Sequence, residues 1–178
     1  PDVEIYSIDE AFIKLNGFSE NEANKKCKDI IKTVLKWTGI SVSVGLASTK
    51  SLAKVANRIA KKNSDKTNGF YSINDNKKRI EALSNISTRD IWGIGFQNEK
   101  KLSRINIKNG MDFINLPDKW VKKNMSIIGL KLKKELEGTP TLEIEGGKVD
   151  KKSIATTTSF ESEISSLDDL IERITTFS

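Results

Sequence analysis

Histidine is absent from the 178 residues of this chain. The commonest general base of enzymes is therefore missing, and so are Ser-His and Cys-His nucleophile pairs and zinc sites with imidazole ligands. Any catalysis must run on carboxylates, lysines or bound metal.

Cysteine occurs once, as Cys27, which excludes an internal disulfide framework and a cysteine cluster for zinc or iron and sulfur. Its place in an apolar helical pattern indicates a small buried side chain. No apolar run reaches the length of a membrane span, and the start at Pro1 shows neither an initiator methionine nor a signal sequence. We therefore expect a fragment of a longer protein, located in a reducing cytoplasm.

The charge of the chain is moderately basic, with 30 Lys and Arg against 24 Asp and Glu and a net charge of +6. A basic excess favours a polyanionic partner such as nucleic acid. Many soluble domains are equally basic, so charge alone does not decide between a nucleic-acid surface and an ordinary one.

Two adjacent carboxylates, Asp9 and Glu10, stand in an otherwise apolar stretch, with Val3 and Ile5 before them and residues 11–15 after them. Strand side chains alternate between faces, so both acids reach one ion only if the chain turns at this point. Short strands on both sides predict a hairpin. Such a pair suits a hard cation such as Mg²⁺, which takes oxygen ligands and substrate phosphates. The alternative is a pair of polar residues in an exposed turn.

Two stretches carry a family resemblance. Tyr6-Ser7-Ile8-Asp9-Glu10-Ala11-Phe12 resembles the palm motif of the Y-family DNA polymerases, the translesion enzymes that include the DinB and UmuC proteins. Residues 45–62, from Gly45-Leu46-Ala47-Ser48-Thr49-Lys50 to Ala60-Lys61-Lys62, resemble a second stretch of the same family, in the same order. The resemblance implies that Asp9 and Glu10 are catalytic metal ligands.

The stretch after Ser48 has helical spacing, with one apolar side and one basic side. The basic side holds Lys50, Lys54, Arg58 and Lys61, which a solvated surface also explains. The resemblance implies that Lys61 contacts the triphosphate of the incoming nucleotide and that Lys54 is a basic DNA-binding position.

The first part of the chain alternates strands and helices. We expect a helix over residues 20–37, a strand over 40–44, a helix that is capped by Ser48 or Thr49 and runs to about residue 62, and a strand over 69–73. This order predicts an α/β layer.

Short helical patterns replace the strands from about residue 77. Residues 86–105 predict a helix, a glycine hairpin at Gly93-Ile94-Gly95 and a second helix. Glycines let a backbone approach phosphate closely, and the helix that follows presents free N–H groups to it. On its own this is an ordinary turn. The resemblance implies a helix-hairpin-helix that holds DNA without reading its sequence.

Further helical patterns cover residues 110–116, 118–125 and 126–138, in which Phe113 and Trp120 are expected in the core. We expect a solvated helix face at Lys131, Lys133 and Lys134. Two stretches resemble the UmuC branch more closely than DinB, namely Trp92-Gly93-Ile94-Gly95 and Glu137-Gly138-Thr139-Pro140.

The fold class implied is α/β (α+β): a partial palm with a mixed or antiparallel sheet, a small all-helical thumb and the start of an α+β little finger domain. We place the palm at residues 1–76, the thumb at 77–140, a linker at 141–152 and the little finger from 153 to 178, with a strand over 153–161 and a helix over 167–177.

The resemblance also implies a function. The intact protein would be an error-prone translesion polymerase of the SOS response, with two Mg²⁺ ions, primer-template DNA and dNTP as substrates, and a sliding clamp, RecA and a UmuD-like subunit as partners. The family uses a further aspartate on an upstream strand, so we expect this fragment to be inactive. The alternatives are a non-catalytic DNA-binding accessory protein and a cyclase-like palm enzyme, and the glycine hairpin disfavours the cyclase.

Overall fold

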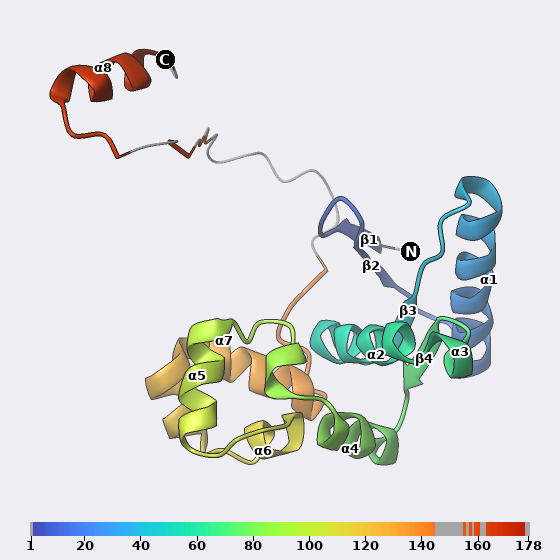
Figure 1. Ribbon diagram of the computed structural model, residues 1–178. Coiled ribbons are helices and arrows are strands. Elements are labelled where there is room, and N and C mark those ends of the chain that lie inside the picture. The colour runs from blue at the N-terminus through green and yellow to red at the C-terminus, as the bar shows by residue number, and fades with distance from the viewer. Residues whose placement is uncertain (1, 145–154, 156, 158, 161–162, 177–178) are drawn as a thin grey trace. The chain divides into compact units, whose positions relative to one another are not determined.

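The computed structural model describes residues 2–144, 155, 157, 159–160 and 163–176 (Figure 1). The chain divides into two compact units, Pro1–Gly146 and Gly147–Ser178. The first unit contains all the strands of the described residues and the helices from α1 to α7. Every site residue predicted from the sequence lies in that unit.

The predicted hairpin is confirmed. Strands β1 (Asp2–Ile5) and β2 (Ala11–Lys14) are antiparallel. The N–H groups of Tyr6 and Ser7 both donate to the carbonyl of Glu10, at 2.9 and 3.0 Å, and close the loop between the strands. The paired acids therefore lie in a tight turn and not in a straight strand.

Strand β3 (Val44–Ala47) pairs in parallel with β4 (Phe70–Ile73). The strand predicted over 40–44 is wrong except at Val44, because pairing begins there, where its N–H donates to the Gly69 carbonyl at 2.8 Å. In β3, a Cβ on Gly45 would lie 2.2 Å from the Ala53 carbonyl oxygen. Gly45 therefore lets the helix after β3 pack directly on the strand.

The strands form two separate pairs. Within the described residues β2 pairs only with β1, and β3 only with β4. The expected palm sheet is thus present as one antiparallel and one parallel pair, and not as one mixed sheet.

Two long helices accompany the strands. Helix α1 (Glu20–Thr38) begins with a capping box between Ser19 and Glu22, and its pattern buries Cys27 as predicted. Helix α2 (Lys50–Lys62) is capped by the Thr49 side chain, which accepts from the Leu52 N–H at 3.2 Å. A short helix, α3 (Ser64–Thr67), follows where only a polar turn was expected.

Helices and the short segments that connect them make up residues 76–137. The elements are α4 (Asn76–Asn85), a 3₁₀ turn η1 (Thr88–Asp90), α5 (Phe96–Arg104), α6 (Gly110–Ile114) and α7 (Asp118–Glu137). The helix predicted before the glycine hairpin is only the η1 turn. Helix α7 breaks at Ser126 (φ 65°, ψ −173°), so the prediction of two helices meeting there is confirmed.

One core joins the α/β part to the helical part. It includes Leu52 and Val55 of α2 together with Leu83, Phe113 and Leu136 of the helical part, all at most 1% exposed. Phe113 is a core residue as expected, and Trp120 packs partly buried against the same cluster. The division at residue 76 stays a prediction, since the core crosses it.

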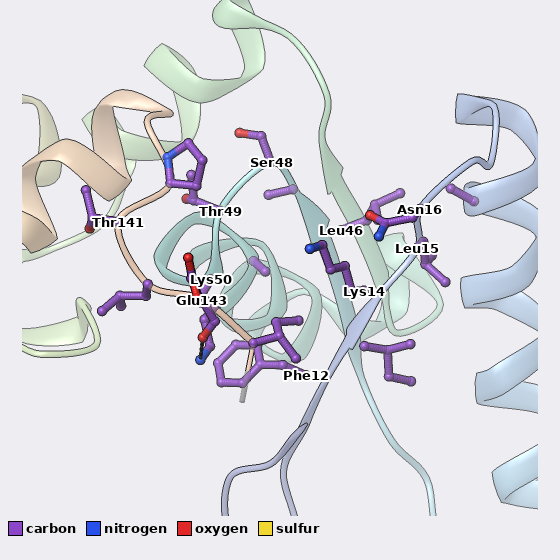
Figure 2. A pocket seen from close by; sticks show the side chains of 17 residues that line it. Phe12, Lys14, Leu15, Asn16, Leu46, Ser48, Thr49, Lys50, Thr141 and Glu143 are labelled. Carbon is purple, nitrogen blue, oxygen red and sulfur yellow. Dashed lines mark hydrogen bonds between the residues drawn. The ribbon is translucent and has the colours of Figure 1, made fainter. Parts of the chain in front are cut away.

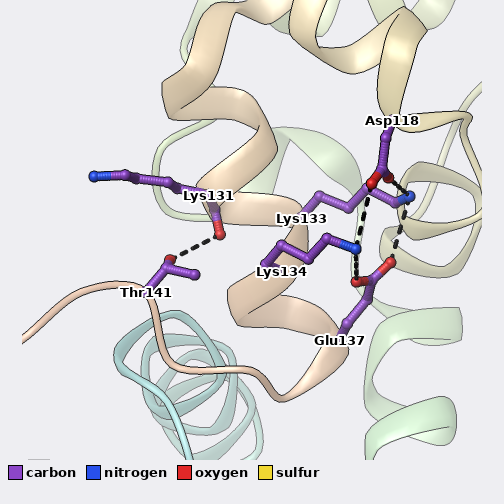
Figure 3. Close-up of polar contacts among 6 residues, drawn as sticks. All are labelled: Asp118, Lys131, Lys133, Lys134, Glu137 and Thr141. Atoms are coloured by element: carbon purple, nitrogen blue, oxygen red, sulfur yellow. Dashed lines mark hydrogen bonds and ion pairs between the residues drawn. The ribbon is translucent and has the colours of Figure 1, made fainter.

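The solvated face predicted for three lysines of α7 is wrong for Lys133, which is 6% exposed (Figure 3). The break at Ser126 brings the two halves of α7 together, and Lys133 contacts Asp118 and lies 3.4 Å from the Glu137 carboxylate. Lys134 joins the same two carboxylates. The cluster joins the two ends of α7 around the buried Lys133, while Asp118 and Lys134 stay partly exposed.

In the second unit, the predicted helix is present as α8 (Leu167–Thr176). Its last predicted residue, Phe177, lies outside the described residues, and so does most of the strand expected over 153–161 and of the linker expected over 141–152.

A buried carboxylate joins α7 to α2 and to the segment that follows α7. Glu135 is 0% exposed, and its side chain accepts from the N–H groups of Ser51 (3.1 Å), Thr141 (2.6 Å) and Leu142 (3.0 Å). Its own carbonyl accepts from the Thr49 hydroxyl at 2.8 Å. This junction fixes the start of α2 relative to the end of α7.

Replacing Glu135 by Ala should lower the free energy of unfolding by about 3 kcal/mol, because three amides lose a charged acceptor away from bulk water. Urea unfolding followed by circular dichroism measures the change. Glu81→Ala, on the exposed side of α4, is the matched control and should change stability by less than about 0.5 kcal/mol. Equal effects of the two substitutions would contradict the assignment of the junction.

Candidate functional site

The tip of the β1–β2 hairpin presents an ionised acid. Asp9 is exposed, and the Ser7 hydroxyl donates to its Oδ1 at 2.6 Å. This hydrogen bond lowers the pKa of Asp9 below its ordinary value, and the positive charges of Lys61 and Lys54 lower it further. Asp9 is therefore ready at neutral pH to accept a cation.

Glu10 faces helix α2. The Lys54 ammonium lies 2.5 Å from Glu10 Oε1 and 5.7 Å from the centre of the Tyr6 ring. The two acids thus have different partners, Ser7 for Asp9 and Lys54 for Glu10. Lys54 was predicted as a DNA contact, and the structure places it beside the acid pair.

Lys50 ties the hairpin to α2 one turn earlier. Its ammonium binds the Glu4 carboxylate at 2.7 Å and lies 5.0 Å from the centre of the Phe12 ring. It also donates to the Glu143 carbonyl at 2.9 Å (Figure 2). The first half of the basic side of α2 is therefore covered by the hairpin and is not a solvated surface.

The second half of that side contacts η1. Arg58 and Lys62 bind the two oxygens of Asp90 at 2.7 and 2.5 Å, and the hydrogen bond from Lys62 is the main cause of the lowered pKa of Asp90. Lys61 lies between them in sequence, is exposed, and its charge acts on Asp9. Lys61 is thus available to a ligand near the acids.

A cavity of about 290 Å³ adjoins the acids. Asp9 and Glu10 line it together with β2, residues of α1 and β3, and the side chains of Lys54 and Asn57 from α2. A second cavity of about 740 Å³ lies between β2, the end of β3 and residues 140–144 (Figure 2). Both are lined by residues of β2 and β3, so the space between the two strand pairs is hollow.

The donor set suits a magnesium ion. Mg²⁺ is commonly held by one or two carboxylates, with water and substrate phosphates completing its shell, and the hairpin tip offers two carboxylates. Among the described residues, no group of three or more acids, cysteines or histidines could hold a metal. Two carboxylates are enough in number for one such ion, and a second ion needs a further ligand.

The glycine hairpin lies between η1 and α5. Gly93 has a φ of 92°, a left-handed value that favours glycine, whereas Gly95 is the N-cap of α5 with a φ of −77°. No side chain in the described structure caps α5, and a Cβ on Gly95 would meet nothing within 4 Å. The Ile94 side chain is buried, so only its backbone is available to a ligand.

A direct contact joins the two hairpins. The indole N–H of Trp92, the residue before Gly93, donates to the Tyr6 hydroxyl at 3.0 Å. Sequence reasoning missed the roles of Tyr6, Trp92 and Asp90 in joining the hairpins and α2. Tyr6 and Trp92 both lie in the motifs quoted from the sequence. No local pattern, however, indicates a contact between positions 86 residues apart.

The described residues include no helix that is both long and apolar enough to cross a membrane.

Comparisons with known proteins place the chain in a family. Residues 1–58 match the model of the impB/mucB/samB family. Protein UmuC of Salmonella typhimurium is 34% identical over 98% of this chain and 42% of its own length. DNA polymerase IV of Picrophilus torridus is 38% identical, over 71% of this chain and 34% of its own length. The chain therefore spans less than half of these relatives.

Solved structures share the fold. A Y-family DNA polymerase chimera has a TM-score of 0.66 at 23% identity and covers 83% of this chain, which covers 42% of the chimera. A ternary complex of Dbh has a TM-score of 0.58 at 26% identity over 76% of this chain and 40% of its own. DinB from Sulfolobus solfataricus has a TM-score of 0.63 at 23% identity over 82% of this chain and 42% of its own.

The solved structures agree with the fold of this chain. Matches named UmuC and MucB extend over 98% of the chain, whereas those named DNA polymerase IV cover between 57% and 71%. The chain therefore belongs to the impB/mucB/samB family of Y-family polymerases, and it is closer to the UmuC members than to DNA polymerase IV.

Proposed function

We propose that the protein to which this chain belongs is an error-prone translesion DNA polymerase that acts in SOS damage tolerance. The observation that carries the proposal is the acid pair of the hairpin tip, with Lys54 and Lys61 beside it. A carboxylate pair binds metal and an adjacent ammonium binds phosphate, which is the donor set that nucleotidyl transfer requires.

In this proposal Asp9 and Glu10 hold Mg²⁺. When bound, two such ions would activate the primer 3′ hydroxyl and neutralise the leaving pyrophosphate. Glu10 must exchange its ion pair with Lys54 for the metal, and the Tyr6 ring, 5.7 Å from the Lys54 ammonium, offers that cation an alternative contact. The chain alone supplies two acids, so we expect it not to extend a primer.

Two further parts of the chain would bind substrates. Lys61 is exposed and near enough to Asp9 to lower its pKa, which suits contact with the triphosphate of a metal-bound nucleotide. The backbone from Gly93 to Gly95 and the uncapped start of α5 would hold a DNA phosphate. Such contacts position DNA and do not read its sequence.

The partners of the longer protein belong to the same proposal. One structural neighbour, the ternary complex of Dbh, contains substrates, which supports DNA and dNTP as ligands. Similarity to UmuC supports a UmuD-like subunit. A sliding clamp, RecA and a cytoplasmic location are expectations from the family.

Primer extension tests the acid pair. In the longer protein, Asp9→Ala with Glu10→Ala should reduce extension on undamaged and abasic templates about a thousandfold, since metal ligation contributes several kcal/mol to the barrier. Asp65→Ala with Glu81→Ala removes the same charge from exposed helix positions and should leave the rate unchanged. If the longer protein binds DNA but never extends a primer, it is an accessory DNA-binding protein and the polymerase proposal fails.

Steady-state kinetics test Lys61. Lys61→Ala should raise the KM for dNTP about tenfold in the longer protein, because a charge-assisted contact of roughly 1.4 kcal/mol is lost. Lys66→Ala, on α3, removes an equal charge from an exposed position and is the control. A KM that is unchanged in Lys61→Ala would remove Lys61 from the nucleotide site.

Binding of this chain to a short duplex tests the glycine hairpin. Gly95→Ala adds a methyl group that meets no protein atom, so the thermal unfolding midpoint should not change. The methyl group would keep a phosphate from the backbone, and the dissociation constant measured by fluorescence anisotropy should rise about tenfold. Unchanged affinity at matched salt would show that DNA does not approach Gly95.

A further inference from the structure

Three aromatic side chains, Tyr6, Phe12 and Trp92, form one cluster, which we call the aromatic bridge. The Trp92 ring meets Tyr6 edge-on, with 5.5 Å between centroids and 87° between planes, and it lies 5.9 Å from the Phe12 centroid. Tyr6 and Phe12 are 5.8 Å apart. Edge-on pairs of this kind are attractive beyond the area that they bury, and the Trp92 N–H bond to Tyr6 fixes their orientation.

The bridge joins the two candidate binding elements by short covalent paths. Tyr6 begins the loop that carries Asp9 and Glu10, and its own N–H closes that loop on the Glu10 carbonyl at 2.9 Å. Trp92 directly precedes Gly93. A shift of the glycine hairpin is therefore passed to the acid loop through the contacts of Trp92 with Tyr6 and Phe12.

The bridge also contacts the cation that neutralises Glu10. The Lys54 ammonium lies over the Tyr6 ring and binds Glu10, while the Lys50 ammonium lies over the Phe12 ring. Lys54 thus contacts both the Tyr6 ring and the Glu10 carboxylate. The bridge is therefore connected through Lys54 to Glu10, a side chain that we assign to the metal.

The η1 turn, which precedes Trp92, is bound to helix α2. Asp90 binds Arg58 and Lys62 of α2, and these ion pairs join the η1 turn to that helix. Tyr6 itself is 46% exposed, unlike the fully buried Glu135 junction, and can therefore shift without opening the core. The bridge is the adjustable contact between two anchored elements.

We propose that Trp92 is a positioning residue that couples the glycine hairpin to Asp9 and Glu10. DNA backbone at Gly93–Gly95 and a divalent metal at the acids then change each other's affinity. The coupling is reciprocal, because binding free energies form a thermodynamic cycle. The inference rests on the proposed function, since both ligands are taken from it.

The test measures this coupling in the chain itself. The dissociation constant of Mn²⁺, which serves as the probe of the acid pair in electron paramagnetic resonance, is determined with and without a short primer-template duplex. In the unsubstituted chain the two constants should differ roughly fivefold, and in Trp92→Leu they should become equal. Trp37→Leu makes the same chemical change at an exposed position of α1, 79% exposed, and should retain the fivefold difference.

Two milder variants separate positioning from folding. Trp92→Phe removes the indole N–H and Tyr6→Phe removes its acceptor, and both keep an aromatic ring in the bridge. Each variant, and the double variant, should reduce the coupling by the same factor, while urea unfolding stays close to that of the unsubstituted chain. A role confined to stability would lower the unfolding midpoint and leave the coupling intact, which would overturn the proposal.

The outcomes distinguish this proposal from the one on which it rests. If the unsubstituted chain binds neither Mn²⁺ nor duplex, the proposed function fails and the coupling fails with it. If it binds both with no change in either constant, the proposed function stands and the coupling alone is wrong. If the fivefold difference survives in Trp92→Leu, another contact carries the coupling and Trp92 is not its positioning residue.

Discussion

The pairing of basic side chains of α2 with carboxylates of neighbouring segments is the constraint on which the site depends. Leu52, Val55 and Ala56 bury the apolar side of this helix in the shared core. The other side reaches Glu4 and Glu10 of the hairpin through Lys50 and Lys54, and Asp90 through Arg58 and Lys62. One helix thus places both the acid loop and the segment that leads into the glycine hairpin.

Ion pairs of this kind contribute little to stability where they are exposed, because solvent screens them and ordering long side chains costs entropy. Their contribution here is geometric. Lys54 is backed by the Tyr6 ring and Lys50 by the Phe12 ring, so each ammonium is confined by an aromatic face as well as by its carboxylate. Confinement from two sides defines where the hairpin lies on α2.

The sequence patterns predicted those elements that depend on interactions between residues close together in the chain. The turn at Asp9 and Glu10 followed from apolar runs on both sides, and α2 followed from its two-sided spacing and the cap at Thr49. The strand expected over 40–44 was wrong, because backbone pairing with β4 begins at Val44 and continues through Gly45, which has no alternating side chain to reveal it. Lys133 was assigned to a solvated face because the sequence does not show that the break at Ser126 folds α7 back on Asp118. The contacts of Trp92 with Tyr6 and of Asp90 with α2 join positions far apart in the chain, and no periodicity reports such contacts.

The charges around the acid pair define what the site can bind. Two carboxylates, Asp9 and Glu10, lie close to two ammonium groups, Lys54 and Lys61, so their formal charges cancel. A site that is neutral overall attracts a bare divalent cation less strongly than the acid pair alone would, since both lysines repel it. A triphosphate that arrives with its metal brings negative charge for the lysines and positive charge for the acids together. The arrangement therefore favours a metal-nucleotide complex over either component alone, and the exposed position of Lys61 leaves one ammonium available to that complex.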